Sequence, residues 1–325
     1  MENTTIKGFL KYWLDSVMRG SIRQSSYMAY RGYIENHINP SIGTEELLAV
    51  KAERLQAFIG ELTEKGLASK TVRSIMLMLR GALECAVDYE YIIKNPCDKV
   101  RLPRLEEKEV IVFDESDQKR LENTVMHGGD KRYFGILICL YTGLRIGELC
   151  GLKWDSVNFA QSTIEIKSSL NRVITYDGGA KKTAVVEVAP KTKKSRRTIP
   201  LPQFLCDLLK KLRKESNSEY VVSMKNGKAV EPRMMQIVYT KLLNEAGVAY
   251  VSFHTLRHTF TTRAIEFGVD VKTISEILGH SNTMITVNRY AHSLFGQKRK
   301  MMERFNHFFG QATQAQIFFK RHLIE

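Results

Sequence analysis

The 325-residue sequence has little that would suit a membrane protein or a secreted protein. Its longest apolar run, Tyr133 to Leu144, is too short to cross a bilayer and instead predicts a buried helix. No basic segment followed by an apolar one opens the chain, so no signal peptide is expected. The five cysteines are scattered and form no C-x-x-C pair, which predicts buried free thiols in a reducing compartment. These absences predict a cytoplasmic protein without a membrane partner.

What the sequence has in excess is positive charge. The formal net charge is +14, with a sequence pI of about 9.5. The excess is uneven, because residues 1–103 carry 14 Lys and Arg against 12 Asp and Glu, whereas residues 104–325 carry 35 against 23. Such a balance indicates a polyanionic partner, but ribosomal, membrane-surface and DNA-binding proteins all share it.

The hydrophobic pattern divides the chain into a helical first part and a mixed second part, with no internal repeat. Apolar residues at helical spacing predict four helices that would form a small bundle, over residues 6–17, 27–38, 55–66 and 69–87. We expect Asn39-Pro40 to stop the second helix and Ser69 to cap the fourth. The charged stretch 94–104, with two prolines, suits a linker.

From Glu106 onward helices flank a β-rich interval, with helices at 116–125 and 132–141 and strands at 163–168, 171–176, 183–189 and 197–201. The fold class predicted is therefore mainly α: a helical bundle followed by a mixed α/β domain, mostly helical, with one small antiparallel sheet.

Two clusters offer arginine next to a helix start. In the first, Gly143 would begin a helix that carries Arg145 in its first turn and Glu148 over the same face. A surface Arg–Glu pair is the plainer interpretation, yet the apolar surroundings favour an arginine that is held near the core to bind an anion. In the second, Ser252 would cap a helix that places His254 beside Arg257. His254 and His258 also have a zinc-compatible spacing, but the Glu of H-E-x-x-H and nearby thiolates are missing.

Two further clusters offer a proton donor and a nucleophile. The basic run from Lys191 to Arg197 lies between two predicted strands, where it is either a solvated turn or a hairpin laid along a phosphate backbone. Gly279 would end a helix and turn His280 away from it, and Tyr290 follows ten residues later. A lone tyrosine is most often structural, so none of these clusters decides a function by itself.

Together the clusters match what phosphodiester cleavage requires. Two arginines suit the non-bridging oxygens, because their planar guanidinium groups bind phosphate through two hydrogen bonds and stay charged. A tyrosine hydroxyl attacks only with help in losing its proton, and the departing oxygen needs a donor such as lysine or histidine.

In order and spacing these elements resemble the tyrosine recombinase, or phage integrase, family. The resemblance is carried by TGLRIGEL, PKTKKSRRTIPL, HTLRHTF, LGH and NRYAH, and it extends more weakly over residues 4–100. It implies that Tyr290 forms a 3′-phosphotyrosine bond and releases a 5′-hydroxyl. Arg145, Arg257 and His280 would hold the non-bridging oxygens, while His254 would assist proton transfer. Lys191, with Lys193 as the alternative, would protonate the leaving oxygen, and Glu148 would orient the basic groups.

The resemblance also implies an organisation: a core-binding DNA-binding domain of SAM-like type at 1–103, a catalytic domain at 104–295, and a tail at 296–325 that docks on a neighbouring protomer or packs on its own domain. The two domains would clamp duplex DNA in a C shape. The residues expected to contact DNA are Arg23, Lys70, Arg73, Lys193, Lys194, Arg196 and Arg197. A solvated surface is the alternative interpretation of Arg23, Lys70 and Arg73.

The mechanism of the family implies which partners the protein binds and requires no cofactor. We expect a homo-tetramer on two double-stranded DNA sites, in a nucleoid-associated protein of a phage or other mobile element, and an accessory DNA-bending protein is compatible with this. No ATP or metal is expected, since the phosphotyrosine bond conserves the energy. The chain begins with the core-binding helices, so no arm-site binding is expected.

Two other functions fit the same residues. A type IB-like topoisomerase uses nearly the same chemistry on one duplex, and a catalytically silent regulator would keep the fold and use Tyr290 only for packing. The compact first domain and the apolar tail favour a recombinase.

Overall fold

A computed structural model of the chain describes residues 4–105, 110–177, 180–188, 196–280, 282–284, 299 and 301–304. The chain divides into two compact units. One comprises Met1–Lys108 with Val173–Thr183, and the other comprises Glu109–Arg172 with Ala184–Glu325. Among the described residues, no helix combines the length and the apolar character needed to span a bilayer.

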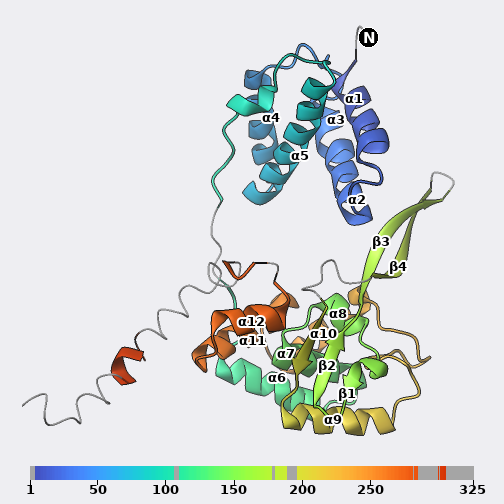
Figure 1. Cartoon of the computed structure of the whole chain (residues 1–325), viewed down its shortest axis with the longest axis vertical. Coiled ribbons are helices and arrows are strands. Elements are labelled where there is room, and N and C mark those ends of the chain that lie inside the picture. Colours follow the sequence, from blue (N-terminus) through green and yellow to red (C-terminus); the bar gives the residue numbers. More distant parts are fainter. Residues whose placement is uncertain are drawn as a thin grey trace, which may run out of the picture. The chain divides into compact units, whose positions relative to one another are not determined.

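The first unit contains the predicted helical bundle (Figure 1). Buried side chains from each predicted helix, among them Phe9, Ile38, Phe58 and Leu79, meet in one hydrophobic core. Its elements are α1 (Ile6–Tyr12), η1 (Trp13–Met18), α2 (Gln24–Tyr33), η2 (Ile34–Ile38), α3 (Asn39–Ile42), α4 (Ala52–Glu64), α5 (Ser69–Asp88) and η3 (Pro96–Lys99).

Two predicted helix ends in this unit were wrong. The second helix does not stop at Asn39-Pro40, because η2 is a π-helical turn in which the Asn39 N–H donates to the Ile34 carbonyl. Proline has no N–H to contribute, but it fits the first turn of α3, so the helical path continues to Ile42. Ser69 is the first residue of α5 and not its cap, since Ala68 holds that position without a side-chain hydrogen bond.

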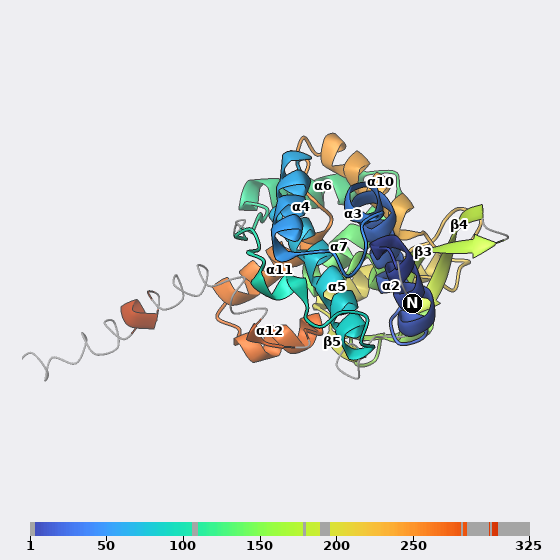
Figure 2. The same cartoon turned by 90° about the horizontal axis from the view of Figure 1, so that it is seen from above.

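Helices form most of the second unit and enclose its larger core. The apolar stretch predicted as a buried helix is α7, whose residues from Gly135 to Leu140 are all buried, and α11 packs against it. Figures 1 and 2 both draw α11 and α12 side by side. The helices are α6 (Glu115–His127), η4 (Lys131–Tyr133), α7 (Phe134–Thr142), α8 (Ile146–Cys150), η5 (Trp154–Ser156), α9 (Gln203–Lys214), α10 (Pro232–Glu245), α11 (His254–Glu266) and α12 (Val271–Leu278).

The described strands form two small sheets where one was predicted. The first has the order β1-β2-β5 and is antiparallel, with Ile164 opposite Ile199; the second pairs β3 with β4. Along the chain, β3 and β4 come between β2 and β5, which pair with each other (Figure 1). The strands are β1 (Val157–Asn158), β2 (Thr163–Ile166), β3 (Ser169–Asp177), β4 (Ala180–Val188) and β5 (Arg197–Pro200).

The prediction of free thiols is confirmed. All five cysteines are unpaired, and four of them are buried. Burial raises the pKa of Cys97 and of Cys150 to about 12, so these thiols stay protonated and act as small apolar side chains.

Candidate active site

The C-terminal end of α12 is closed by a glycine in the left-handed conformation. Gly279 has φ of 63°, its N–H donates to the Glu276 carbonyl, and the His280 N–H donates to the Ser275 carbonyl. This pair of bonds defines a Schellman motif, in which glycine avoids the steric cost of a Cβ atom. The predicted helix end at Gly279 is therefore confirmed, and His280 is the first residue beyond it.

Three arginines from distant parts of the chain converge on this helix end. Arg197 donates through Nε to the Ile277 carbonyl, and Arg257 donates through Nη2 to the Leu278 carbonyl at 2.7 Å. Arg145 donates through Nη2 to the Gly279 carbonyl at 3.4 Å. These carbonyls are consecutive and lie at the negative end of the helix dipole, where positive charge is stabilised. The end of α12 thus gathers three guanidinium groups around one point.

Glu148 joins two of these arginines. Its Oε1 accepts hydrogen bonds from Arg145 Nη1 at 2.8 Å and Arg197 Nη1 at 3.0 Å, and its Oε2 accepts one from Arg197 Nη2 at 2.9 Å. Burial by itself would raise the pKa of Glu148, but the hydrogen bonds and charges of Arg197 and Arg145 outweigh it and hold the pKa at about 2. The carboxylate therefore stays ionised. Three guanidinium groups and one carboxylate leave a net positive site.

Arg257 is positioned by the turn that follows α7. Its Nη1 donates to the Gly143 carbonyl at 2.8 Å, and the residue is only 2% exposed. The prediction that Gly143 starts a helix was wrong. With φ of 66° it ends α7, and α8 begins three residues later at Ile146. Arg145 consequently precedes the first turn of α8, and its backbone N–H donates to Glu148 Oε2 at 3.0 Å.

The two arginines of the predicted site differ in how far they face solvent. The Arg145 side chain is 38% exposed, whereas Arg257 is buried behind the end of α12. Arg145 is thus the guanidinium that an incoming anion would meet from solvent, while the dense contacts of Arg257 fix its orientation.

The two predicted histidines lie at helix ends. His254 is the exposed first residue of α11, one turn before Arg257, and its ring stands edge-on to that of His258 at 4.6 Å. The prediction that Ser252 caps this helix was wrong, because Phe253 holds the cap position. The Ser252 carbonyl instead accepts a hydrogen bond from the Thr255 N–H. His280 is half-buried, directly after the carbonyl that Arg145 contacts.

Arg197 lies in a different place from the one expected. The sequence placed it among cations facing DNA, but its side chain is 6% exposed and is paired with Glu148. Along β5 the residues alternate between buried and exposed, with Arg197 and Ile199 on the buried face. The sequence could have indicated the burial of Arg197, because residues two apart on a strand face the same side and Ile199 is apolar. Its neighbour Arg196 points outward, 66% exposed, and pairs with Glu165.

Other predicted residues lie outside the described ones, namely Lys191, Lys193, Lys194 and Tyr290, as does most of the tail. In the first unit, Arg23 and Lys70 are exposed at the starts of α2 and α5. Arg73 is half-buried and donates to the Pro103 carbonyl at 3.0 Å.

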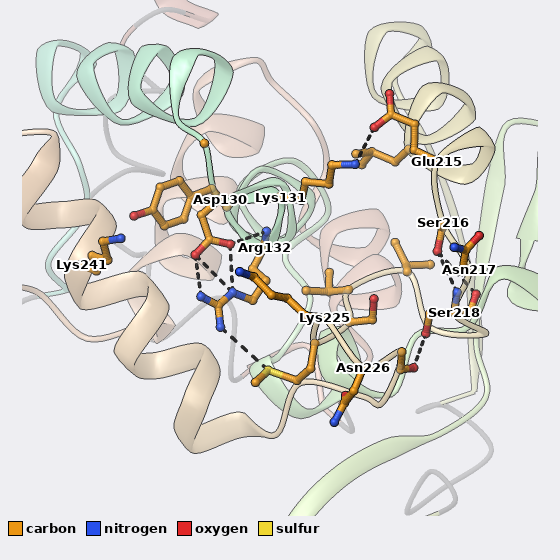
Figure 3. Close-up of a pocket in the computed structure, with 18 of the residues that line it drawn as sticks. Asp130, Lys131, Arg132, Glu215, Ser216, Asn217, Ser218, Lys225, Asn226 and Lys241 are labelled. Carbon is orange, nitrogen blue, oxygen red and sulfur yellow. Dashed lines mark hydrogen bonds and ion pairs between the residues drawn. The ribbon is translucent and has the colours of Figure 1, made fainter.

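A cavity of about 980 Å³ lies elsewhere in the second unit, and its lining includes none of the arginine cluster (Figure 3). Several of the charged groups that line it pair with one another. Arg132 binds Asp130 through Nε and Nη2, and Lys131 Nζ lies 2.7 Å from Glu215. Because none of the predicted site residues lines it, this cavity is not the candidate active site.

Two models of one protein family match this chain. The phage integrase family matches residues 104–297, and the N-terminal SAM-like domain of phage integrases matches residues 5–63. The chain belongs to the phage integrase family. A tyrosine recombinase XerC-like protein of Caldanaerobacter subterraneus is 32% identical over 95% of this chain and 84% of its own length. The ICEBs1 integrase of Bacillus subtilis is 25% identical over 85% of this chain and 76% of its own length.

Solved structures of this family share the fold. The Tn1549 transposon integrase, in complex with a circular intermediate DNA, superposes with a TM-score of 0.79. It is 22% identical and covers 93% of this chain and 99% of its own. A lambda integrase dimer bound to a core site has a TM-score of 0.67 at 14% identity, over 88% of this chain and 77% of its own. The mainly helical fold with small antiparallel sheets is thereby confirmed.

Proposed function

We propose that this protein is the site-specific recombinase of a mobile element, which cleaves and rejoins DNA through a 3′-phosphotyrosine at Tyr290. One observation carries the proposal: Arg145 and Arg257 both donate to carbonyls at the end of α12, directly before His280, and Arg145 also pairs with an ionised Glu148. A cluster with net positive charge and planar donors suits a phosphodiester, whose developing charge such groups stabilise. Family membership and the integrases among its relatives support the same reaction class.

In the proposed reaction, the Tyr290 oxygen attacks the scissile phosphorus and loses its proton, with help from His254. A bond forms between the tyrosine oxygen and phosphorus, while the bond from phosphorus to the 5′ oxygen breaks. Lys191, or Lys193 in its place, gives that oxygen a proton, and a free 5′-hydroxyl leaves. Arg145, Arg257 and His280 hold the non-bridging oxygens in line.

Rejoining is the same sequence in reverse, with a 5′-hydroxyl from a second strand as the nucleophile. One phosphodiester is exchanged for another, so the reaction needs neither ATP nor a metal ion. Exchange between two duplexes requires several active sites, which is the reason to propose a homo-tetramer. A lambda integrase tetramer has been solved on a Holliday junction. A cytoplasmic location, an accessory DNA-bending protein and the C-shaped clamp remain predictions.

The test uses the full-length protein and nicked duplexes from the genomic DNA next to its gene. A nick near the cleavage site lets the 5′-hydroxyl fragment diffuse away, so the covalent adduct accumulates and is seen by denaturing electrophoresis. We expect an adduct with the wild type and none with Tyr290→Phe, while both bind the duplex equally. No adduct under any condition would favour the DNA-binding regulator. Relaxation of plasmids without a specific site would favour the topoisomerase.

A further inference from the structure

Arg197 belongs to the arginine cluster, although no step of the proposed reaction uses it. Its Nη1 and Nη2 donate to the two oxygens of Glu148, and its Nε donates to the Ile277 carbonyl. One planar group therefore connects α8 to the end of α12. Its own strand, β5, lies against α12.

We propose that Arg197 is a positioning residue, which sets the geometry of Arg145 and His280 through Glu148 and the end of α12. This inference rests on the proposed function. Glu148 reaches Arg145 on one side and Arg197 on the other, so a shift of the carboxylate would move the Arg145 guanidinium. Ile277 lies three residues before His280, so the Nε hydrogen bond fixes the turn that carries the histidine.

The geometry requires an arginine here and not simply a positive charge. Three N–H groups in one plane reach two carboxylate oxygens and a carbonyl simultaneously, which a lysine ammonium on a flexible stem does not reproduce. The end of α12 also leaves little room for adjustment. A Cβ atom added at Gly279 would lie 3.0 Å from Arg197 Nη1, so the guanidinium is packed directly against the Schellman turn.

Arg197 differs from the neighbouring cation Arg196, because the Arg197 guanidinium is paired with Glu148 inside the fold. The Arg197 side chain is 6% exposed, whereas that of Arg196 is 66% exposed. Loss of a phosphate contact weakens DNA binding and its salt dependence. Loss of a positioning residue slows the chemical step while binding is kept, because small misplacements of catalytic groups cost large factors in rate.

The experiment compares Arg197→Lys with the wild type in single-turnover cleavage of the nicked duplex that carries the mapped adduct site. We expect the cleavage rate to fall by about 10- to 100-fold, with the DNA dissociation constant within about threefold of wild type. The matched control is Arg120→Lys, since Arg120 forms an exposed surface pair with Asp117 in α6, and its rate should equal that of wild type. Thermal unfolding shows that each variant is folded.

Arg197→Gln adds a readout that a merely structural role would not change. Without the guanidinium, the pKa of Glu148 rises because burial is then opposed by less positive charge. Cleavage by this variant should therefore decline on acidification from pH 7.5 to pH 5, relative to wild type. The double variant Glu148→Gln/Arg197→Gln removes both buried charges together, so its cleavage should lose that extra acid sensitivity. It should also fold even if Arg197→Gln alone is too unstable to fold, because no buried carboxylate is left without this partner.

Each outcome decides the proposal. Wild-type cleavage rates in a folded Arg197→Lys would overturn it, as would a loss of DNA affinity that accounts for the whole decrease in rate. An unchanged pH profile in a folded Arg197→Gln would also overturn it. If the wild type itself forms no adduct, the proposed function fails and this inference fails with it; an active wild type with an equally active Arg197→Lys removes only the inference.

Discussion

Arg145 and Glu148 are joined twice across the first turn of α8. The backbone N–H of Arg145 donates to Oε2 of Glu148 at 3.0 Å, and its guanidinium donates to Oε1 at 2.8 Å. The same carboxylate accepts two further bonds from Arg197. A buried carboxylate with two arginine partners is stabilised in its charged form. The free energy of unfolding of the second unit therefore depends on pH.

The first prediction concerns that pH dependence. The pKa of Glu148 in the folded protein is about 2, below its ordinary value of 4.5. The unfolded chain therefore binds the proton more readily, and the contribution of Glu148 is fully present above about pH 4.5 and lost as the pH falls towards 2. The contribution is about 3 kcal/mol at neutral pH. Urea unfolding between pH 2 and pH 7 measures it.

Glu148→Gln is the matched variant, because it keeps the shape and removes the charge. It should lower the free energy of unfolding by about 3 kcal/mol at pH 6, since Arg197 is left without its buried partner. The difference from wild type should shrink below about pH 4.5. A constant difference across the whole pH range would show that Glu148 is not the titrating group.

The second prediction concerns the close approach at Gly143. A Cβ atom there would lie 2.6 Å from Leu278 Cδ2 and 2.8 Å from Phe260 Cδ1, and φ is 66°. Gly143→Ala should destabilise the second unit by about 1–3 kcal/mol and slow cleavage, because it pushes α12 away from Arg257. Thermal unfolding and adduct formation measure the two effects.

Gly129→Ala is the control for that substitution, since nothing lies within 4 Å of the added atom and φ is not positive. It should unfold and cleave like the wild type. Equal behaviour of the two alanine variants would contradict the packing argument at Gly143.

The third prediction identifies the proton donor in the basic run. Lys191→Ala should slow cleavage of ordinary DNA strongly, since the departing 5′ oxygen then lacks its acid. A substrate with sulfur in place of that bridging oxygen should restore the rate, because a thiolate leaves without a proton. Lys193→Ala serves as the comparison. If the bridging-sulfur substrate restores the cleavage rate of Lys193→Ala and not that of Lys191→Ala, the proton donor is Lys193.

The fourth prediction concerns DNA contact by the first unit. Arg23→Ala and Lys70→Ala should each weaken DNA binding on all sequences and reduce the slope of log affinity against log salt by about 1. Arg80→Ala is the comparison, because Arg80 is an exposed cation of the same unit that was not expected to contact DNA; it pairs with Asp98 at 2.8 Å. Titrations at several salt concentrations measure the slopes, and an unchanged slope for Arg23→Ala or Lys70→Ala would remove that residue from the DNA-contacting set.

Local patterns in the sequence were sufficient for most elements. The apolar run of α7, the bundle of the first unit, the strand at β5 and the glycine that ends α12 were all predicted, because each depends on side-chain periodicity or on one residue's backbone preference. The helix through Pro40 was mispredicted because a π-helical turn supplies an alternative hydrogen bond that the sequence does not display.

The order of the arginines, the histidines and Glu148 along the chain was enough to predict the reaction class, because this family carries these residue types in that order. That Arg197 lies with Arg145 and Arg257, and not with the cations that face solvent, was established by the packed fold, in which β5 contacts α12. The physical reason is that three consecutive carbonyls at the end of α12 attract guanidinium groups from segments up to 134 residues apart, an attraction that exists only once the helix and the strand are packed together.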